Sequence, residues 1–154
     1  MGEVTIRRAG ADDAFVVAAL HLQSARDLGM PSEPGFLDRF VDVWLRERPD
    51  RPTWIAQHDG EHAGILETRR LRTLPWPARP EASALHVENL FVAPTHRGTG
   101  VAQALAEAMI EWAHSTDVTS VRAMAANDRD RELYDRLGFS SPGRLMEFDL
   151  REPS

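Results

Sequence analysis

The stretch Thr95–Leu105, THRGTGVAQAL, joins an apolar run to an amphipathic one and carries two glycines one residue apart, Gly98 and Gly100. Glycine adopts left-handed backbone at little steric cost, so the pair alone indicates no more than a tight turn. The flanking segments add to this, because the apolar run ALHVENLFV over 84–92 precedes the turn and helix-spaced apolar residues follow it up to Trp112. This order predicts a strand that passes through a glycine turn directly into a helix.

A turn of this kind suits an anion. The first N–H groups of a helix have no partner within the helix, and the helix dipole favours negative charge there by about 0.3–1 kcal/mol. Glycines leave room for a phosphate, and Arg97 adds donors suited to a pyrophosphate. The P-loop pattern does not fit, because its lysine is missing, and Gln103 stands where the Rossmann pattern needs a third glycine. The residues alone therefore indicate either a plain turn or a site for a diphosphate-containing cofactor.

Periodicity along the rest of the chain predicts a mixed sheet with helices on its faces. Asp59-Gly60 is a hairpin signal between two apolar strands. The expected elements are a strand at 4–6, a helix from Asp12 to Gly29 with Phe15, Val16, Ala19, Leu20 and Gln23 on its apolar side, a helix over 36–45, strands at 53–57 and 62–66, an arginine- and proline-rich connection over 69–80, a strand over 118–125, a helix over 129–137 and a last strand over 144–150.

Composition narrows the class of protein. The 154 residues match one soluble domain, and the lack of cysteine excludes disulfides, zinc–thiolate sites and a cysteine nucleophile. All 18 basic residues are arginine, which excludes a Schiff-base lysine. The net charge of −6 argues against nucleic-acid binding and favours a cationic small substrate. No histidine spacing indicates a metal, and no apolar run indicates a membrane span or secretory signal, so we expect no metal, no membrane and a cytoplasmic protein.

Two motifs resemble those of a known superfamily. Arg97-Gly98-Thr99-Gly100-Val101-Ala102 fits the pattern R/Q-x-x-G-x-G/A, which is the acyl-CoA pyrophosphate loop of the GNAT N-acetyltransferases. The stretch Asn127–Phe139 resembles their N-x-x-A-x-x-L-Y-x-x-x-G-F signature. One departure is Asp130, which stands where the superfamily usually has a small residue. The chain is therefore similar to GNAT enzymes over most of its element order, with its motif core at 84–140.

The resemblance implies a fold and a co-substrate. The fold is an α/β (α+β) one, with a central, mostly antiparallel twisted sheet, a splayed parallel strand pair and helices on both faces, in a single domain over 1–154. The co-substrate is acetyl-CoA, without a metal. Its pantetheine arm would bond the backbone of the strand before the turn, and its pyrophosphate would bind the turn and the helix start. The implied cofactor-binding residues are Leu90, Phe91, Val92, Arg97, Gly98, Thr99, Gly100, Val101, Ala102, Gln103 and Asn127.

Acetyl transfer to an amine also needs two proton transfers. An alkyl ammonium with a pKa near ~10 must lose a proton before it attacks, so a general base is required. Glu88 matches a position where several enzymes of the superfamily carry that base, with His86 as a second candidate and a surface or structural carboxylate as the alternative. Tyr134 matches the general acid that protonates the leaving CoA thiolate, and its alternative is a packing role.

We therefore expect an N-acetyltransferase that moves acetyl from acetyl-CoA to a primary amine of a small molecule by direct attack in a ternary complex. Alternatives are a catalytically silent acyl-CoA-binding or interaction module, a protein N-terminal acetyltransferase, and a longer acyl group. A homodimer is expected from the resemblance. The cluster of Arg69, Arg70, Arg72 and Arg79 around Trp76 is expected to be a solvated loop.

Overall fold

The computed structural model describes residues 2–79, 81–141, 143 and 146–151. It contains two compact units, one up to Met124 and one from Ala125 onward. The first unit consists of β1 (Val4–Arg8), α1 (Ala14–Asp27), α2 (Phe36–Glu47), β2 (Thr53–His58), β3 (Glu61–Arg72), β4 (Ser83–Val92), α3 (Val101–His114) and β5 (Val118–Ala123), with short 3-10 turns at Ala11–Asp13, Arg48–Asp50 and Pro94–His96. The second unit contains α4 (Asp128–Arg136).

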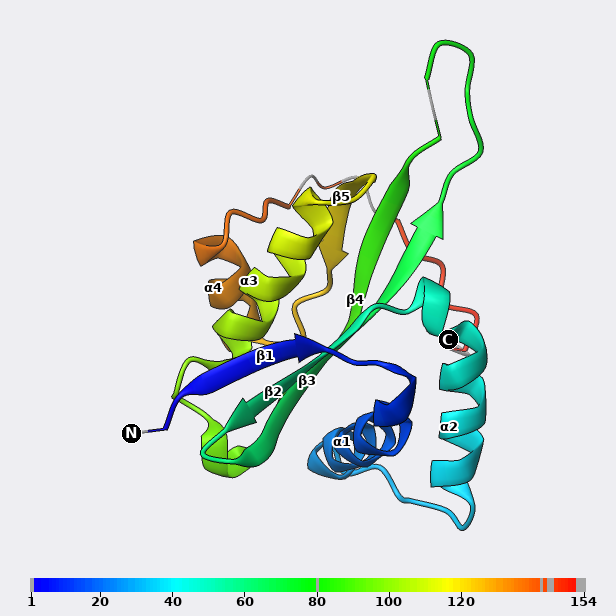
Figure 1. The fold of residues 1–154 in the computed structure, drawn as a ribbon. Helices are drawn as coiled ribbons and strands as arrows, with labels where there is room; N and C mark the ends of the chain where they lie inside the picture. Colours follow the sequence, from blue (N-terminus) through cyan, green and yellow to red (C-terminus); the bar gives the residue numbers. More distant parts are fainter. Residues whose placement is uncertain (1, 80, 142, 144–145, 152–154) are drawn as a thin grey trace. The chain divides into compact units, whose positions relative to one another are not determined.

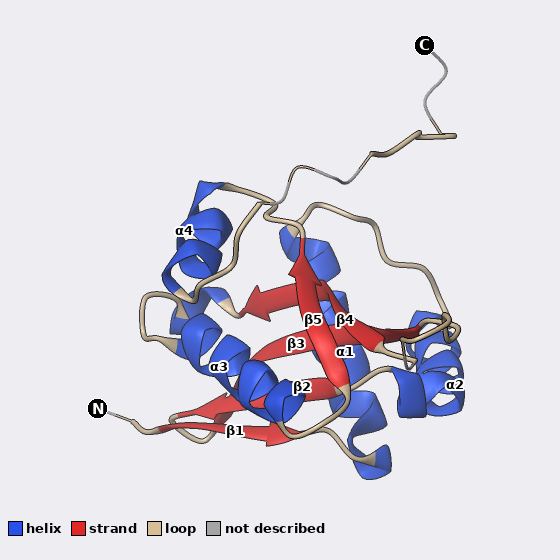
Figure 2. Ribbon diagram, turned by 90° about the horizontal axis from the view of Figure 1, so that it is seen from above, coloured by secondary structure: helices blue, strands red, loops and turns tan. Residues whose placement is uncertain are grey.

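The five strands form one sheet in the order β1-β2-β3-β4-β5. The first four strands pair antiparallel, and β5 runs parallel to β4. Helices α1 and α2 cover one face of this sheet and α3 covers the other (Figures 1 and 2). This mixed sheet confirms the fold class that the sequence predicts.

The main hydrophobic core lies between the sheet and α1 with α2. Ile55, Ile65 and Phe91 from three neighbouring strands pack there with Leu20 and Trp44. The expected apolar side of the first helix is partly wrong, because Phe15 is 60% exposed while α1 buries a different set: Ala14, Val17, Ala18, Leu20 and Ser24. Two overlapping stripes in this helix satisfy a 3.6-residue period, and the sheet it packs against selects one of them.

The β2–β3 hairpin turns at Asp59 and Gly60, whose φ angles of 54° and 76° are those of the expected tight turn. Strand β3 then runs to Arg72, so the expected connection beginning at Arg69 is wrong at its start. The first four residues of that expected connection, 69–72, pair with β4, from Arg69 opposite His86 to Arg72 opposite Ser83. The aliphatic part of an arginine side chain can pack on a sheet while its guanidinium reaches polar partners. The guanidinium of Arg70 forms an ion pair with Asp117 and lies over the ring of Trp112.

The second unit is described by itself. Asn127 caps α4, since its side-chain oxygen accepts the N–H of Asp130 at 2.9 Å, and Gly138 with φ 96° follows the last helical turn. The expected strand over 144–150 is wrong for the residues that are described. Residues 144 and 145 lie outside them, and 146–150 form no strand. The alternating Met146, Phe148 and Leu150 are all exposed, because alternation makes a strand only where another edge supplies hydrogen bonds.

Candidate functional site

A β-bulge at Glu88 is the first feature of the site. Glu67 of β3 lies opposite Asn89 and Thr68 lies opposite Val87, which leaves Glu88 as the extra residue on β4. Successive strand residues normally point to opposite faces. Because a bulge redirects side chains locally, Glu88 and its neighbour Asn89 both line the same pocket.

Strand β4 loses its parallel partner at the same point. Pairing with β5 runs from Ser83 to Val87 and then stops, although β4 continues to Val92. The β4 edge that faces away from β3 therefore has no strand partner over 88–92 within the described part of the chain. Backbone N–H and C=O groups without a ladder partner can bond an extended ligand, as an added strand would.

This open edge leads into the glycine turn. Gly98 and Gly100 have φ angles of 77° and 86°, and a Cβ built on either would meet no atom within 4 Å. Helix α3 begins immediately after, and its first recorded backbone bond runs from the Ala104 N–H to the Gly100 carbonyl. No acceptor is recorded among the described residues for the N–H groups of 101–103, so three donors are available to an anion.

The side chains of the turn are less free than the sequence suggests. Arg97 donates through Nε to the Val92 carbonyl at 3.0 Å and through Nη2 to Asp27 at 2.8 Å, which holds its guanidinium against the end of α1. Thr99 donates to the His96 carbonyl. Val101 and Phe91 are buried, so these two can reach a ligand through backbone groups alone.

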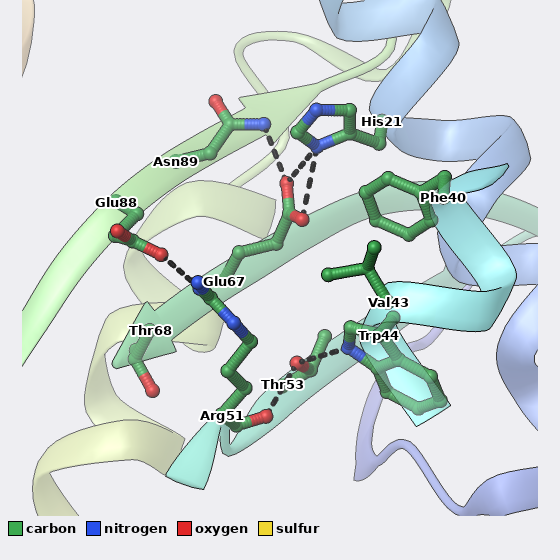
Figure 3. Close-up of a pocket in the computed structure, with 10 residues that line it drawn as sticks. All are labelled: His21, Phe40, Val43, Trp44, Arg51, Thr53, Glu67, Thr68, Glu88 and Asn89. Atoms are coloured by element: carbon green, nitrogen blue, oxygen red, sulfur yellow. Dashed lines mark hydrogen bonds and ion pairs between the residues drawn. The ribbon is translucent and has the colours of Figure 1, made fainter. Parts of the chain in front are cut away.

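Next to the bulge lies a pocket of about 350 Å³ between α1, α2 and the sheet (Figure 3). One wall is apolar and comes from α2. The other wall carries titratable and polar side chains from α1 and the strands. The lining residues are His21, Phe40, Val43, Trp44, Arg51, Thr53, Glu67, Thr68, Glu88 and Asn89.

The deepest charged group in this pocket is Glu67, whose side chain is 11% exposed. Nδ1 of His21 lies 2.9 and 2.8 Å from its two carboxylate oxygens, and Asn89 Nδ2 donates to it at 2.8 Å. Ser24 continues the network by donating to Asn89 Oδ1 at 3.3 Å. The hydrogen bond that His21 donates to Glu67, together with the negative charge of that carboxylate, raises the pKa of His21 above its usual 6.5 despite partial burial.

Glu88, the candidate base from the sequence, lies in the same pocket but is bound differently. Its side chain is 46% exposed and forms an ion pair with Arg51, which also bonds Glu47 at 2.8 Å. His86 lies on β4 outside the pocket-lining set. The structure thus places Glu88 beside Glu67, His21 and Arg51, three residues that sequence reasoning did not select. The available signal for Glu67 was a carboxylate within the run AGILET over 63–68, which the structure buries.

Tyr134 belongs to the second unit. It is buried, its ring lies 5.0 Å from that of Phe139, and burial together with the nearby Asp130 carboxylate raises its pKa to about 12. Its hydroxyl therefore stays protonated at neutral pH and can act as a donor. Asn127 uses its side-chain oxygen for the helix cap, which leaves its Nδ2 as the group that could meet a ligand.

Two other classes of site are absent from the residues that the structure describes. No group of three or more histidine, aspartate or glutamate side chains there could hold a metal ion. Among the same residues, none of the helices has the length and apolar character needed to cross a bilayer.

Comparison with known proteins gives a family. The model of the acetyltransferase (GNAT) family matches residues 20–139. The sequence has no significant match among the curated proteins.

Solved structures with the same fold are numerous, and three illustrate their range. A predicted acetyltransferase from Clostridium acetobutylicum, solved with acetyl-CoA, is 16% identical with a TM-score of 0.78, covering 97% of each chain. A ribosomal-protein-alanine N-acetyltransferase from Brucella melitensis biovar Abortus 2308 is 23% identical with a TM-score of 0.74, covering 98% of this chain and 100% of its own. Glucosamine-6-phosphate N-acetyltransferase from Arabidopsis thaliana is 14% identical with a TM-score of 0.72, covering 96% and 99%.

Proposed function

The chain belongs to the acetyltransferase (GNAT) family, and from that premise we propose that it transfers acetyl from acetyl-CoA to a primary amine of a small molecule. The amine attacks the thioester directly, in a ternary complex of enzyme, acetyl-CoA and acceptor. A covalent acetyl-cysteine is not needed, and the chain has no cysteine to form one.

One observation carries the cofactor side of this proposal: the open β4 edge leads, through the short 3-10 turn at Pro94–His96, into the glycine turn and the start of α3. The backbone of Leu90, Phe91 and Val92 would bond the pantetheine arm. The N–H groups of Val101, Ala102 and Gln103, with the turn of Gly98, Thr99 and Gly100, would bind the pyrophosphate. Arg97 would bind the cofactor after exchanging its contact with Asp27. Asn127 would bind the cofactor through its amide nitrogen.

The acceptor would bind in the pocket beside the bulge. Its apolar wall suits the carbon skeleton of a small molecule, and its two carboxylates, Glu67 and Glu88, favour a cationic amine. The proton acceptor is one of the titratable groups there, either Glu88, as the sequence suggests, or the pair formed by His21 and Glu67. Tyr134 would return a proton to the CoA thiolate, and its raised pKa of about 12 keeps it protonated for that step.

The proposal treats both compact units as one catalytic domain over 1–154, which the family match across their boundary supports. The cytoplasmic location and the homodimer stay predictions. Light scattering on purified protein measures the oligomeric state, and a monomer at assay concentrations contradicts the homodimer.

The deciding experiment has two parts. Calorimetry with acetyl-CoA measures cofactor binding, and thiol release is then followed with small amines, aminoglycosides, amino sugars, amino acids and peptides that have a free amino terminus. Release with a small amine supports the proposal. Release with peptides alone points to an N-terminal acetyltransferase. Binding without release for any acceptor indicates a silent acyl-CoA-binding module. Replacing acetyl-CoA by longer acyl-CoA esters tests the acyl group.

A further inference from the structure

The His21–Glu67 pair has the geometry of an oriented imidazole base. Both Glu67 oxygens lie within 2.9 Å of the same ring nitrogen, Nδ1, and Asn89 fixes the carboxylate from the other side (Figure 3). A carboxylate only accepts hydrogen bonds, so Nδ1 must carry the hydrogen. In a neutral imidazole the second nitrogen, Nε2, then holds the lone pair.

Packing fixes the ring in this orientation. The His21 ring lies 4.6 Å from the ring of Phe40 and 6.1 Å from that of Phe36, both on α2. Among the described residues no hydrogen-bond partner is recorded for His21 Nε2, and His21 lines the acceptor pocket. The His21 side chain is 36% exposed, and a nitrogen lone pair with a fixed tautomer and no protein partner among the described residues is what proton abstraction requires.

We propose that His21, oriented by Glu67, is the general base that takes the proton from the acceptor ammonium. This inference rests on the proposed function and names a residue for it. Glu67 acts as the positioning residue that sets the tautomer and stabilises the imidazolium, as the aspartate does in a serine-protease triad. Glu88 is less suited to this role, because Arg51 holds its carboxylate.

Charged groups around His21 agree with this assignment. Glu67 of β3 bonds the ring directly, Glu88 of β4 adds a further negative charge, and both raise the His21 pKa. Arg51 lines the same pocket and is held by Glu47 and Glu88. From α2 the ring meets Phe36 and Phe40, which carry no charge. A raised His21 pKa brings this base closer to the pKa of an amine, which favours proton transfer from the acceptor ammonium.

The protons balance. An acceptor R–NH3⁺ gives one proton to His21 Nε2, which passes it to solvent, and the neutral amine then attacks the acetyl carbonyl. The C–N bond forms, the C–S bond breaks as the tetrahedral intermediate collapses, and the nitrogen loses a second proton. The CoA thiolate gains one proton, so the products are the amide, CoA thiol and one released proton.

The test compares the pH dependence of kcat/KM in the full-length enzyme and its variants. For the parent we expect an acidic limb at the pKa of His21. Glu67→Gln keeps a hydrogen-bonding oxygen but removes the charge, so the limb should move to lower pH by about 1–2 units. His21→Gln should abolish the limb and lower kcat/KM about 100-fold or more at neutral pH. Glu88→Gln removes a more distant negative charge, so the limb should persist and move less than in Glu67→Gln. The exposed His62→Gln is the matched control and should leave the limb where it is.

Nuclear magnetic resonance supplies a readout that does not depend on turnover. The ring ¹⁵N signals of His21 are assigned as those that are missing from the spectrum of His21→Gln. They should show the Nδ1–H tautomer, and the His21 pKa from their titration should equal the pKa of the acidic limb in kcat/KM. A limb that disappears in Glu88→Gln, or that stays unmoved in Glu67→Gln or His21→Gln while thiol release continues, overturns the proposal. Acetyl-CoA binding without release to any amine instead overturns the proposed function, and the two failures are therefore distinct.

Discussion

The glycine turn and the acceptor pocket lie at the same strand but are built in different ways. Every group of the turn comes from consecutive residues over 97–103, and its geometry follows from two left-handed glycines and the start of one helix. The pocket draws its lining from residues between 21 and 89 on two helices and three strands. The proposed pyrophosphate site is therefore local in sequence, whereas the proposed acceptor site and its proton transfer depend on tertiary packing. Changes in one region should therefore leave the other unaffected.

Tyr134→Phe lies in the second unit, outside both regions, and carries the largest expected effect. The variant keeps the ring beside Phe139 but removes the hydroxyl, so kcat should fall about 100-fold because the thiolate leaves unprotonated. Acetyl-CoA affinity by calorimetry should not change. Since the Tyr134 pKa is about 12, the parent's kcat should also show no basic limb from this group below about pH 11. Equal turnover in the variant removes Tyr134 from the mechanism.

Gly100→Val breaks the turn. A β-branched residue at φ 86° is strained by about 1–3 kcal/mol, and its side chain occupies the space open to the pyrophosphate, so acetyl-CoA should bind at least about tenfold more weakly. Gly60→Val is the matched control, because Gly60 has φ 76° and open surroundings but lies in the β2–β3 hairpin. The control should lose stability by a similar amount and keep its affinity. Undiminished affinity in Gly100→Val contradicts the pyrophosphate site.

Glu88→Gln tests the pocket without touching the turn. Its loss removes one of two negative charges that attract a cationic acceptor, and because the side chain is partly exposed the acceptor KM should rise only about two- to fivefold. Calorimetry should find the acetyl-CoA affinity unchanged. A weakened cofactor affinity would show that the two regions are coupled through the bulge.

The smallest expected effect concerns stability. A histidine whose pKa is raised by folding stabilises the native state below its unfolded pKa of about 6.5, and this contribution is lost as pH rises through the folded pKa. The free energy of unfolding of the parent can be measured with urea at pH 5.5 and at pH 8. The contribution from His21 to the difference should be below about 1 kcal/mol because of solvent screening, and other titrating groups add their own contributions. The difference between the parent and Glu67→Gln should shrink at pH 8. A difference that does not depend on pH contradicts the pairing of Glu67 with His21.

Much of the fold was predictable from local patterns. Asp59-Gly60 predicted its hairpin, the apolar run before the turn predicted β4, and the helix expected over 129–137 corresponds to α4 at Asp128–Arg136. Predictions failed where a pattern depended on a partner. Phe15 lies on one of the two possible apolar stripes of α1, and the sheet buries the other stripe. Arg69 continues strand β3 because β4 extends beside it.

Some requirements of the site are likewise not visible in local patterns. At Gly64, a Cβ would lie 2.7 Å from the Phe91 carbonyl and 3.3 Å from a Val101 methyl group. A residue far from the turn in sequence thus permits the close approach of the helix that opens the cofactor site. Nothing in the letters around Gly64 indicates this role, because the requirement arises from the atoms on the neighbouring elements.

The sequence by itself determined the turn, its backbone donors and the family, since left-handed glycines and a helix start are properties of consecutive residues. The tertiary structure decided which side chains line the proposed acceptor pocket. It placed a bulge at Glu88, gave that carboxylate to Arg51, and brought His21 of α1 onto Glu67 of β3, 46 residues apart. The physical reason is that a hydrogen bond between distant residues depends on strand register and helix packing, which short sequence patterns do not specify.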